Sequence, residues 1–290
     1  MRKRKFLSRF SGYLFLLPYL TLFGTFLLLP VCYGLGLSFF RWEMLSLAPP
    51  RFIGFGNYME AFRTPYFWMA LGATFRFVIM IVPLVVIGAL VVAAGINALP
   101  GRFQALFRAA YFLPTIISIS VAGILWRWFF NTEFGLFNAF LLLAGFKAPW
   151  ITDMNWAMKS IVFMTLWWTL GGPMVILLAG LRQIPTQYQE AAAIDGANAL
   201  QRFFYITLPI LRPVLLFVIV ISIIASFQVF GQTFMITRGG PELSTRVLMQ
   251  YIYETAFTNY RIGYGAAMSW LLFLVIALFS FVQFRIIREG

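Results

Sequence analysis

Long runs of apolar residues alternate with short polar segments along the whole chain. Six runs reach the roughly 20 residues that a helix needs to cross the hydrocarbon core of a bilayer. Charged or turn-forming residues separate each run from the next. The pattern predicts six membrane-spanning helices, over about Gly12 to Leu37, Gly72 to Ile96, Leu106 to Phe129, Met158 to Leu181, Ile206 to Phe234 and Ile262 to Ile287.

The composition supports a membrane location for these helices. Hydrophobic residues make up 61% of the 290 residues and charged residues only 11%, whereas about a quarter of a soluble domain is charged. A chain this apolar cannot bury its apolar surface in one water-facing core and requires hydrocarbon as its solvent. We therefore expect an all-α membrane protein, a polytopic bundle of six transmembrane helices.

The basic residues indicate how the chain is oriented. The formal net charge is +13, but these residues stand singly at the ends of apolar runs, without the continuous basic face that binds nucleic acid. They are densest before the first run, at Arg2–Lys5. Because positive residues stay on the cytoplasmic side, we expect a multi-pass protein of the cell (inner) membrane with both termini cytoplasmic. The first run is too long for a signal-peptide core, and no cleavage site follows it, which predicts an uncleaved span.

Two absences narrow the chemistry. The chain has no histidine, and Cys32 is its only cysteine, so histidine catalysis, intrachain disulfides and histidine or cysteine-pair metal sites are excluded. The sequence also lacks a phosphate-binding P-loop motif. We expect no metal or cofactor bound by this chain, and any ATP hydrolysis must take place on another subunit.

The segment between the fourth and fifth runs, residues 182–209, has its own helix signals. Thr186 followed by Gln189 predicts a capping box just after Pro185. The alanines after Glu190 continue a helix, and Gly196 predicts a turn before a second short helix. The expected result is a two-helix loop at the cytosolic surface. An amphipathic helix that rests on lipid headgroups is the alternative interpretation of such a loop.

The spacing in this loop resembles a family signature. Glu190-Ala191-Ala192, three residues, Gly196, nine residues, Ile206, one residue and Leu208-Pro209 match the EAA motif of permease subunits in binding-protein-dependent ABC importers. The flanking sequences are similar to the carbohydrate branch, in particular the maltose and glycerol-phosphate type of first permease subunit. These flanks are Ile184-Pro185, Asp195-Gly196-Ala197, Leu208–Pro213, Arg51–Tyr58 and Thr237–Pro241.

The resemblance implies a division of the chain and a set of partners. Residues 1–11 would be a cytosolic basic amino terminus, residues 12–66 the first transmembrane helix with an outer loop, and residues 67–287 the type I permease core with its coupling loop at 182–209. The partners would be a second permease subunit, normally a paralogue in this branch, two cytosolic ABC ATPase subunits that use ATP and Mg²⁺, and an extracytoplasmic solute-binding protein.

The resemblance also implies roles for the residues of the loop. The motif would dock into a cleft on the ATPase, where Glu190 pairs with a basic residue and Ala191 and Ala192 permit close packing. Gly196 would form the bend between the two helices. The other residues implied in coupling are Asp195, Ile206, Leu208 and Pro209.

A few polar and aromatic residues within the runs are candidates for a substrate path. Gln228 and Gln232 are four residues apart and are expected to share a helix face with Ser226 nearby. Polar side chains at membrane depth usually face a cavity or a neighbouring helix, although they also join helices by hydrogen bonds. Trp167 and Trp168 have ring faces on which sugars can stack, and packing is their alternative role.

Two other classes of function compete with the importer interpretation. A secondary carrier or channel would need no ATPase, but the runs carry no acidic residue suited to proton or sodium coupling. An intramembrane enzyme would need Ser–Lys chemistry, for which Lys159-Ser160, near an outer boundary, gives weak support. We therefore favour a non-catalytic permease subunit for a carbohydrate.

Overall fold

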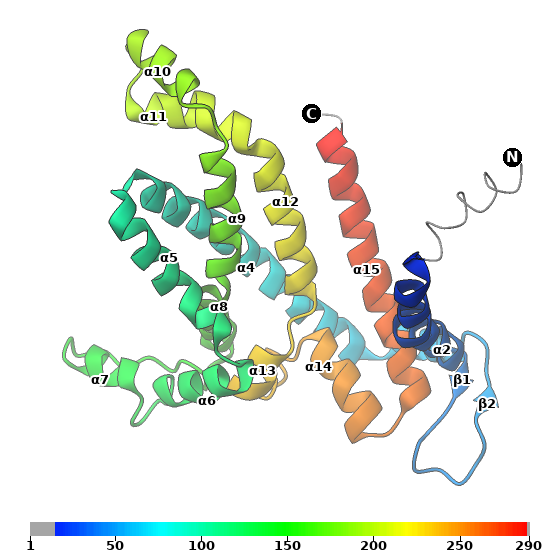
Figure 1. The fold of residues 1–290 in the computed structure, drawn as a ribbon. Helices are drawn as coiled ribbons and strands as arrows, with labels where there is room; N and C mark the ends of the chain where they lie inside the picture. Colours follow the sequence, from blue (N-terminus) through cyan, green and yellow to red (C-terminus); the bar gives the residue numbers. More distant parts are fainter. Residues whose placement is uncertain (1–14, 289–290) are drawn as a thin grey trace, which may run out of the picture. The chain divides into compact units, whose positions relative to one another are not determined.

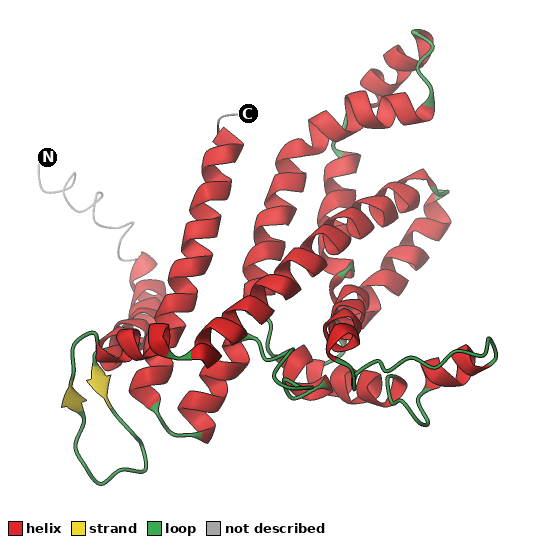
Figure 2. Ribbon diagram, turned by 180° about the vertical axis from the view of Figure 1, so that it is seen from behind, coloured by secondary structure: helices red, strands yellow, loops and turns green. Residues whose placement is uncertain are grey.

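The computed structural model describes residues 15–288, which are mainly helical (Figures 1 and 2). The chain forms two compact units. The first unit contains the residues up to Thr64 together with Ile252–Leu271, and the second contains Pro65–Tyr251 with the residues from Leu272 onward. The basic amino terminus predicted at residues 1–11 lies outside the described residues.

The first unit contains the first span and a short β-hairpin. The apolar helix Phe15–Ser38 is long enough to cross a membrane. It includes a π-helical turn at Gly24–Leu28 and ends as α2, Leu29–Ser38. The remaining elements are β1 (Phe40–Arg41), β2 (Arg51–Phe52), α3 (Gly56–Arg63), a π-helical turn (Glu254–Thr258) and the first part of α15 (Ile262–Arg288).

The Arg51–Tyr58 motif joins the end of the first span to α3 through strand pairing and side-chain hydrogen bonds. The two strands pair antiparallel, with Phe40 opposite Phe52, and Gly54 turns the chain at φ +54°. The buried Asn57 side chain then donates to the carbonyls of Ser38 and Phe40 at 2.8 and 2.9 Å. The motif therefore has a structural role in this unit.

The second unit contains the remaining helices, and several of them pack against α4. Its elements are α4 (Pro65–Ala98), α5 (Gly101–Ile116), α6 (Ile119–Phe129), α7 (Leu136–Leu142), α8 (Met154–Thr169), α9 (Gly171–Arg182), α10 (Thr186–Ile194), α11 (Ala199–Arg202), a π-helical turn (Phe203–Thr207), α12 (Leu208–Phe227), α13 (Gly231–Ile236) and α14 (Leu248–Tyr253).

Helices α4, α9 and α12 form the core of this unit. Helix α4 buries one stripe, which includes Phe77, Ile81 and Val85, at the spacing expected for one helix face. Gly180 of α9 lets α12 approach closely, since a Cβ there would lie 2.8 Å from Leu211. These contacts hold α4, α9 and α12 together.

The described residues provide six candidate spans, as predicted, if each bent helix pair counts as one span. The third predicted span, Leu106 to Phe129, is not one continuous helix, because α5 and α6 meet at 95°. Ser118 caps α6 by accepting from the backbone N–H of Val121, and Pro114 precedes this break. The fourth span bends by 48° between α8 and α9.

The fifth span also differs from its prediction of Ile206 to Phe234. One continuous helix of 29 residues runs from Ala199 to Phe227, and the chain then breaks before the separate helix α13. Helix α13 packs against α6: a Cβ on Gly123 would lie 2.5 Å from Met235, and one on Gly231 2.7 Å from Ile119. The close approach of these two helices explains why the fifth span stops early.

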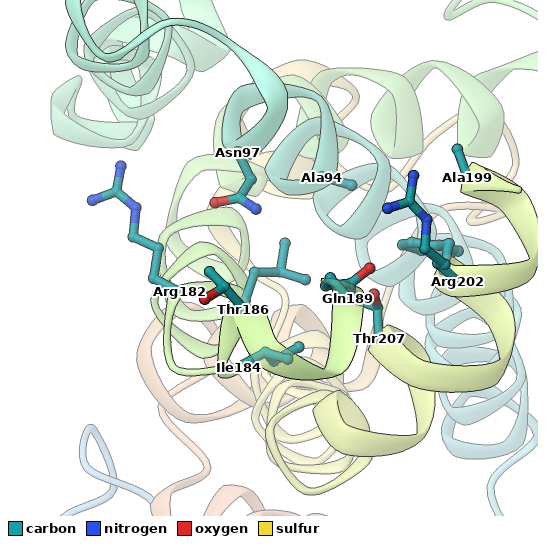
Figure 3. A pocket seen from close by; sticks show the side chains of 11 residues that line it. Ala94, Asn97, Arg182, Ile184, Thr186, Gln189, Ala199, Arg202 and Thr207 are labelled. Atoms are coloured by element: carbon teal, nitrogen blue, oxygen red, sulfur yellow. Dashed lines mark hydrogen bonds between the residues drawn. The ribbon is translucent and has the colours of Figure 1, made fainter. Parts of the chain in front are cut away.

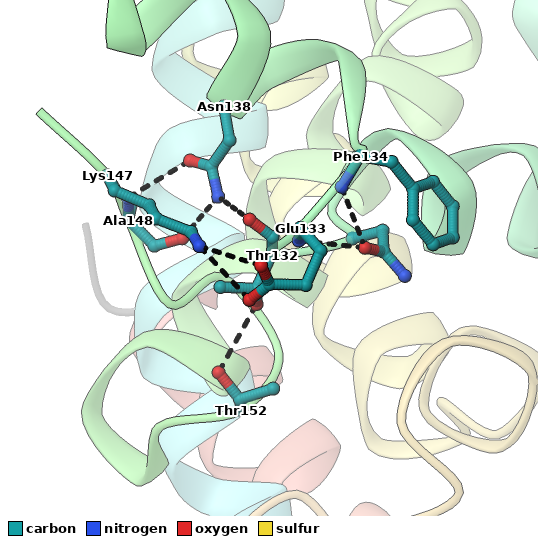
Figure 4. Close-up of polar contacts among 8 residues, drawn as sticks. Thr132, Glu133, Phe134, Asn138, Lys147, Ala148 and Thr152 are labelled. Atoms are coloured by element: carbon teal, nitrogen blue, oxygen red, sulfur yellow. Dashed lines mark hydrogen bonds and ion pairs between the residues drawn. The ribbon is translucent and has the colours of Figure 1, made fainter.

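Asn138 organises the loop between α6 and α8 (Figure 4). Its buried amide donates to the carbonyls of Thr132 and Ala148 at 3.0 and 2.9 Å. Its oxygen accepts from the backbone N–H of Ala148 at 3.0 Å and from the indole N–H of Trp150 at 3.1 Å. One side chain thus satisfies four polar groups and fixes the loop.

We expect Asn138→Ala to destabilise this loop by about 3 kcal/mol, because it leaves several buried polar groups without partners. Protease cleavage between α6 and α8 and melting in detergent would measure the effect. Asn155→Ala, at an exposed position of α8, is the matched control. Equal cleavage rates for the two variants would contradict the structural role of Asn138.

Candidate functional site

The predicted coupling loop, residues 182–209, projects from the ends of α9 and α12 as a hairpin of α10 and α11 (Figure 1). Helix α10 begins after Pro185, which has extended backbone and provides no side-chain cap. The predicted capping box of Thr186 and Gln189 is therefore wrong. The Gln189 amide instead donates to the Thr207 hydroxyl at 2.9 Å, and this bond joins the two arms of the hairpin.

Gly196 makes the turn that was predicted between the two helices. Its φ of +84° is a left-handed conformation that glycine adopts without strain. The N–H of Ala197 donates to the carbonyl of Ala192 at 2.9 Å, and the N–H of Gly196 to that of Ala193 at 3.1 Å. This pair of bonds is a Schellman motif, which closes the end of α10.

A capping box is present at the second helix. The Asn198 side chain accepts from the backbone N–H of Gln201 at 2.9 Å, and the Gln201 side chain accepts from the backbone N–H of Asn198 at 2.8 Å. The second helix is not a separate short one as predicted, because it continues through the π-helical turn into α12. Pro209 lies in the first turn of α12, and the wider turn before it accommodates a residue that lacks a backbone N–H.

The outer surface of the loop exposes apolar and acidic side chains together. Ile194 is 87% exposed, Leu200 70% and Tyr205 80%. Glu190 and Asp195 are exposed as well, and neither forms an ion pair with any of residues 15–288. Large apolar side chains that protrude in this way are typical of an interaction surface.

The alanine, isoleucine and leucine residues of the motif differ in how far they are buried. Ala191 is exposed and Ala192 is half-buried, so one alanine lies on the free side of α10. Ile206 and Leu208 are half-buried on the second arm. Residues 182–209 therefore expose one side of α10 and pack with their half-buried residues against neighbouring parts of the chain.

Two predicted substrate-path residues, Gln228 and Gln232, do not lie on one helix face. Gln228 follows the last residue of α12 and is exposed, whereas Gln232 is buried within α13. The shared face expected from their spacing is wrong because the helix breaks between them. Ser226 donates to the Ser222 carbonyl at 2.6 Å, and the Ser222 hydroxyl is buried without a hydrogen-bond partner among the described residues.

The two tryptophans of the fourth span have packing partners in this chain. Trp167 lies 5.3 Å from Trp126 between ring centroids. Trp168 donates its indole N–H to the carbonyl of Ile117 at 2.9 Å, which is at the break between α5 and α6. These contacts support the packing role of both residues.

The chain is similar to known transport proteins over most of its length. Residues 53–288 match the family described as "Binding-protein-dependent transport system inner membrane component". A lactose transport system permease protein of Rhizobium radiobacter is 35% identical over 285 residues, 96% of this chain and 94% of that protein. A sulfoquinovosyl glycerol transport system permease protein of Agrobacterium fabrum is 34% identical over 285 residues, 97% of this chain and 91% of that protein.

A solved structure shares the fold. It is that of a bacterial ABC transporter involved in the import of the acidic polysaccharide alginate, with a TM-score of 0.83 at 23% identity, over 100% of this chain and 99% of that chain. The likeness confirms the prediction of an all-α membrane protein with about six spans. The chain belongs to the family of binding-protein-dependent transport system inner membrane components, as a non-catalytic permease subunit of the ABC sugar-importer type.

Proposed function

We propose that this chain forms half of the translocation pathway for a carbohydrate and is coupled to a cytosolic ATPase through residues 182–209. The observation that carries this proposal is the exposed surface of the loop. Glu190 lies there without an ion-pair partner among residues 15–288, beside protruding apolar side chains such as Ile194. An ATPase cleft with a basic residue complements both features.

The proposal includes an assembly and an orientation. The partners are a second permease, which is a paralogue, two ATPase subunits that hold ATP and Mg²⁺, and an extracytoplasmic solute-binding protein. Both termini and the coupling loop are cytoplasmic. The amino terminus comprises residues 1–11. The first span with its outer loop comprises residues 12–66, and the permease core comprises residues 67–287.

A coupled loop needs a stiff connection to the spans. The hairpin has one through the Schellman turn at Gly196, the capping box at Asn198 and the Gln189–Thr207 bond. Helix α11 also runs without interruption into α12. Closure of the ATPases can thus move α12 as a lever and change which side of the membrane the pathway faces.

Reconstitution of the chain with its partners in proteoliposomes tests the proposed function. We expect carbohydrate uptake to require ATP on the ATPase side and to persist in the presence of a protonophore. Uptake without ATP that the protonophore abolishes would instead support a secondary carrier. A set of labelled neutral and acidic sugars identifies the substrate.

For the substrate path we propose Ser226, Gln228, Gln232, Trp167 and Trp168. We expect Gln228→Ala to raise the KM for uptake roughly three- to tenfold, because the exposed amide offers a hydrogen bond to a sugar hydroxyl. The melting temperature stays unchanged, since Gln228 does not pack into the core. An unchanged KM would remove this residue from the path.

A further inference from the structure

A cavity of about 460 Å³ lies between the coupling loop and the inner ends of α4 and α9 (Figure 3). Asn97 comes from α4 and Arg182 from α9. Thr186 and Gln189 come from the first arm of the loop, and Arg202 and Thr207 from the second. The cavity thus contacts every element that joins the loop to the spans.

The lining has the chemistry of an anion site. It contains two arginines and several neutral hydrogen-bonding side chains, and no carboxylate. Figure 3 shows Arg182 and Arg202 on opposite sides, with Gln189 and Thr207 between them. The lining contains two arginines and no counter-charge, which favours a negatively charged occupant.

Arg202 has a buried hydrogen-bond donor that such a ligand can satisfy. Its Nε is buried, and no described residue accepts a hydrogen bond from it. A buried donor without a partner is costly, and a guanidinium matches a phosphate group through two parallel hydrogen bonds. Arg182 donates to the side chain of Gln104 and adds a second positive charge across the cavity.

We propose that this cavity binds a phosphate group and that Arg202 is its principal ligand. The inference rests on the proposed function for the cytoplasmic position of the cavity. Two sources offer this chemistry there, namely the headgroup of an anionic lipid in the inner leaflet and a free phosphorylated solute. A phosphate held between α9 and the second arm of the loop stiffens the connection through which the ATPase acts.

Native mass spectrometry of the transporter, released from nanodiscs that contain phosphatidylcholine with or without phosphatidylglycerol, tests the lipid source. We expect the wild-type chain to retain one phosphatidylglycerol under conditions that remove other lipids. Arg202→Gln should weaken this retention about tenfold or more, as expected for loss of a charge-assisted hydrogen bond. Arg202→Lys, which keeps the charge without the planar fork, should retain part of it.

Arg102→Gln is the matched control. Arg102 lies on the exposed surface of α5, where it stacks over Phe103 at 4.9 Å, and it does not line the cavity. We expect this variant to retain the lipid as the wild type does. Equal losses in Arg102→Gln and Arg202→Gln would mean general charge attraction and would overturn the proposal.

The free-phosphate source has its own measurement. In phosphatidylcholine alone, inorganic phosphate should raise the melting temperature of the wild type and not that of Arg202→Gln. If neither phosphatidylglycerol nor phosphate distinguishes the two proteins, the cavity is not a phosphate site. Neither measurement depends on binding of the ATPase, because both report on the cavity of this chain. A failure of the proposed function would instead appear as a complex that lacks the ATPase.

Discussion

Replacing Glu190 by lysine is expected to abolish ATP-driven uptake without preventing membrane insertion. Glu190 is exposed on α10 and makes no ion pair with the described residues, so the change leaves the interior of this chain intact. At the proposed ATPase interface it replaces an attraction by a like-charge contact, which costs about 2 kcal/mol or more. Uptake should therefore fall at least about 30-fold.

Two further variants make this prediction specific. Glu190→Gln removes the charge and keeps the shape, so it should lower uptake less than Glu190→Lys. Glu133→Lys reverses an exposed charge in the loop between α6 and α8, where Glu133 pairs with Lys147 at 3.0 Å, and it should leave coupling to ATP unchanged. Normal uptake by Glu190→Lys would remove the loop from the mechanism.

Replacing Gly171 by alanine is expected to destabilise the second unit strongly. Gly171 begins α9 at the bend of the fourth span, where the backbone of α5 passes very closely. A Cβ at this position would lie 2.5 Å from the carbonyl oxygen of Tyr111 and 2.7 Å from the Cα of Phe112. Because backbone atoms cannot turn aside as a side chain can, α5 and α9 must separate, at a cost of about 1–3 kcal/mol.

The neighbouring glycine provides the matched control. A Cβ on Gly172 would meet nothing within 4 Å, so Gly172→Ala should stabilise α9 by up to about 1 kcal/mol through helix propensity. Melting temperatures in detergent should therefore move in opposite directions for the two variants. A Gly171→Ala protein as stable as Gly172→Ala would contradict the close approach of α5 and α9.

Most of the structure of residues 182–209 was predictable because its signals are local. Gly196 and the alanines after Glu190 specify a helix, a turn and a second helix within a few residues, and the structure confirms that order. The spacing of Thr186 and Gln189 predicts a capping box on the wrong arm, because Gln189 bonds instead to Thr207. That partner lies 18 residues away, and a local pattern does not indicate it.

The breaks in the spans were not predictable from hydrophobic runs alone. Helix α6 leaves the direction of α5 by 95°, although both helices are apolar and together resemble one span in the sequence. The bend is held by contacts between distant residues, such as the Trp168–Ile117 bond across 51 positions and the packing of Met235 on Gly123. Pro114 and Ser118 were the local signals that mark this break.

The separation of Gln228 and Gln232 has the same origin. A spacing of four residues places two side chains on one face only while the helix continues. Helix α12 ends at Phe227, and α13 begins at Gly231, where it packs against Ile119. The sequence predicted polar residues in this region, and the arrangement of those residues depends on contacts with α6.

Native mass spectrometry of the tagged chain, purified gently from its own cells in mild detergent, tests the central claim most directly. We predict that the chain emerges with a second permease and two copies of an ATPase. The Glu190→Lys variant should keep the second permease and lose the ATPase. A wild-type chain that emerges alone or as a homo-oligomer, under conditions that preserve known complexes, would contradict coupling through residues 182–209 and would favour a carrier or channel.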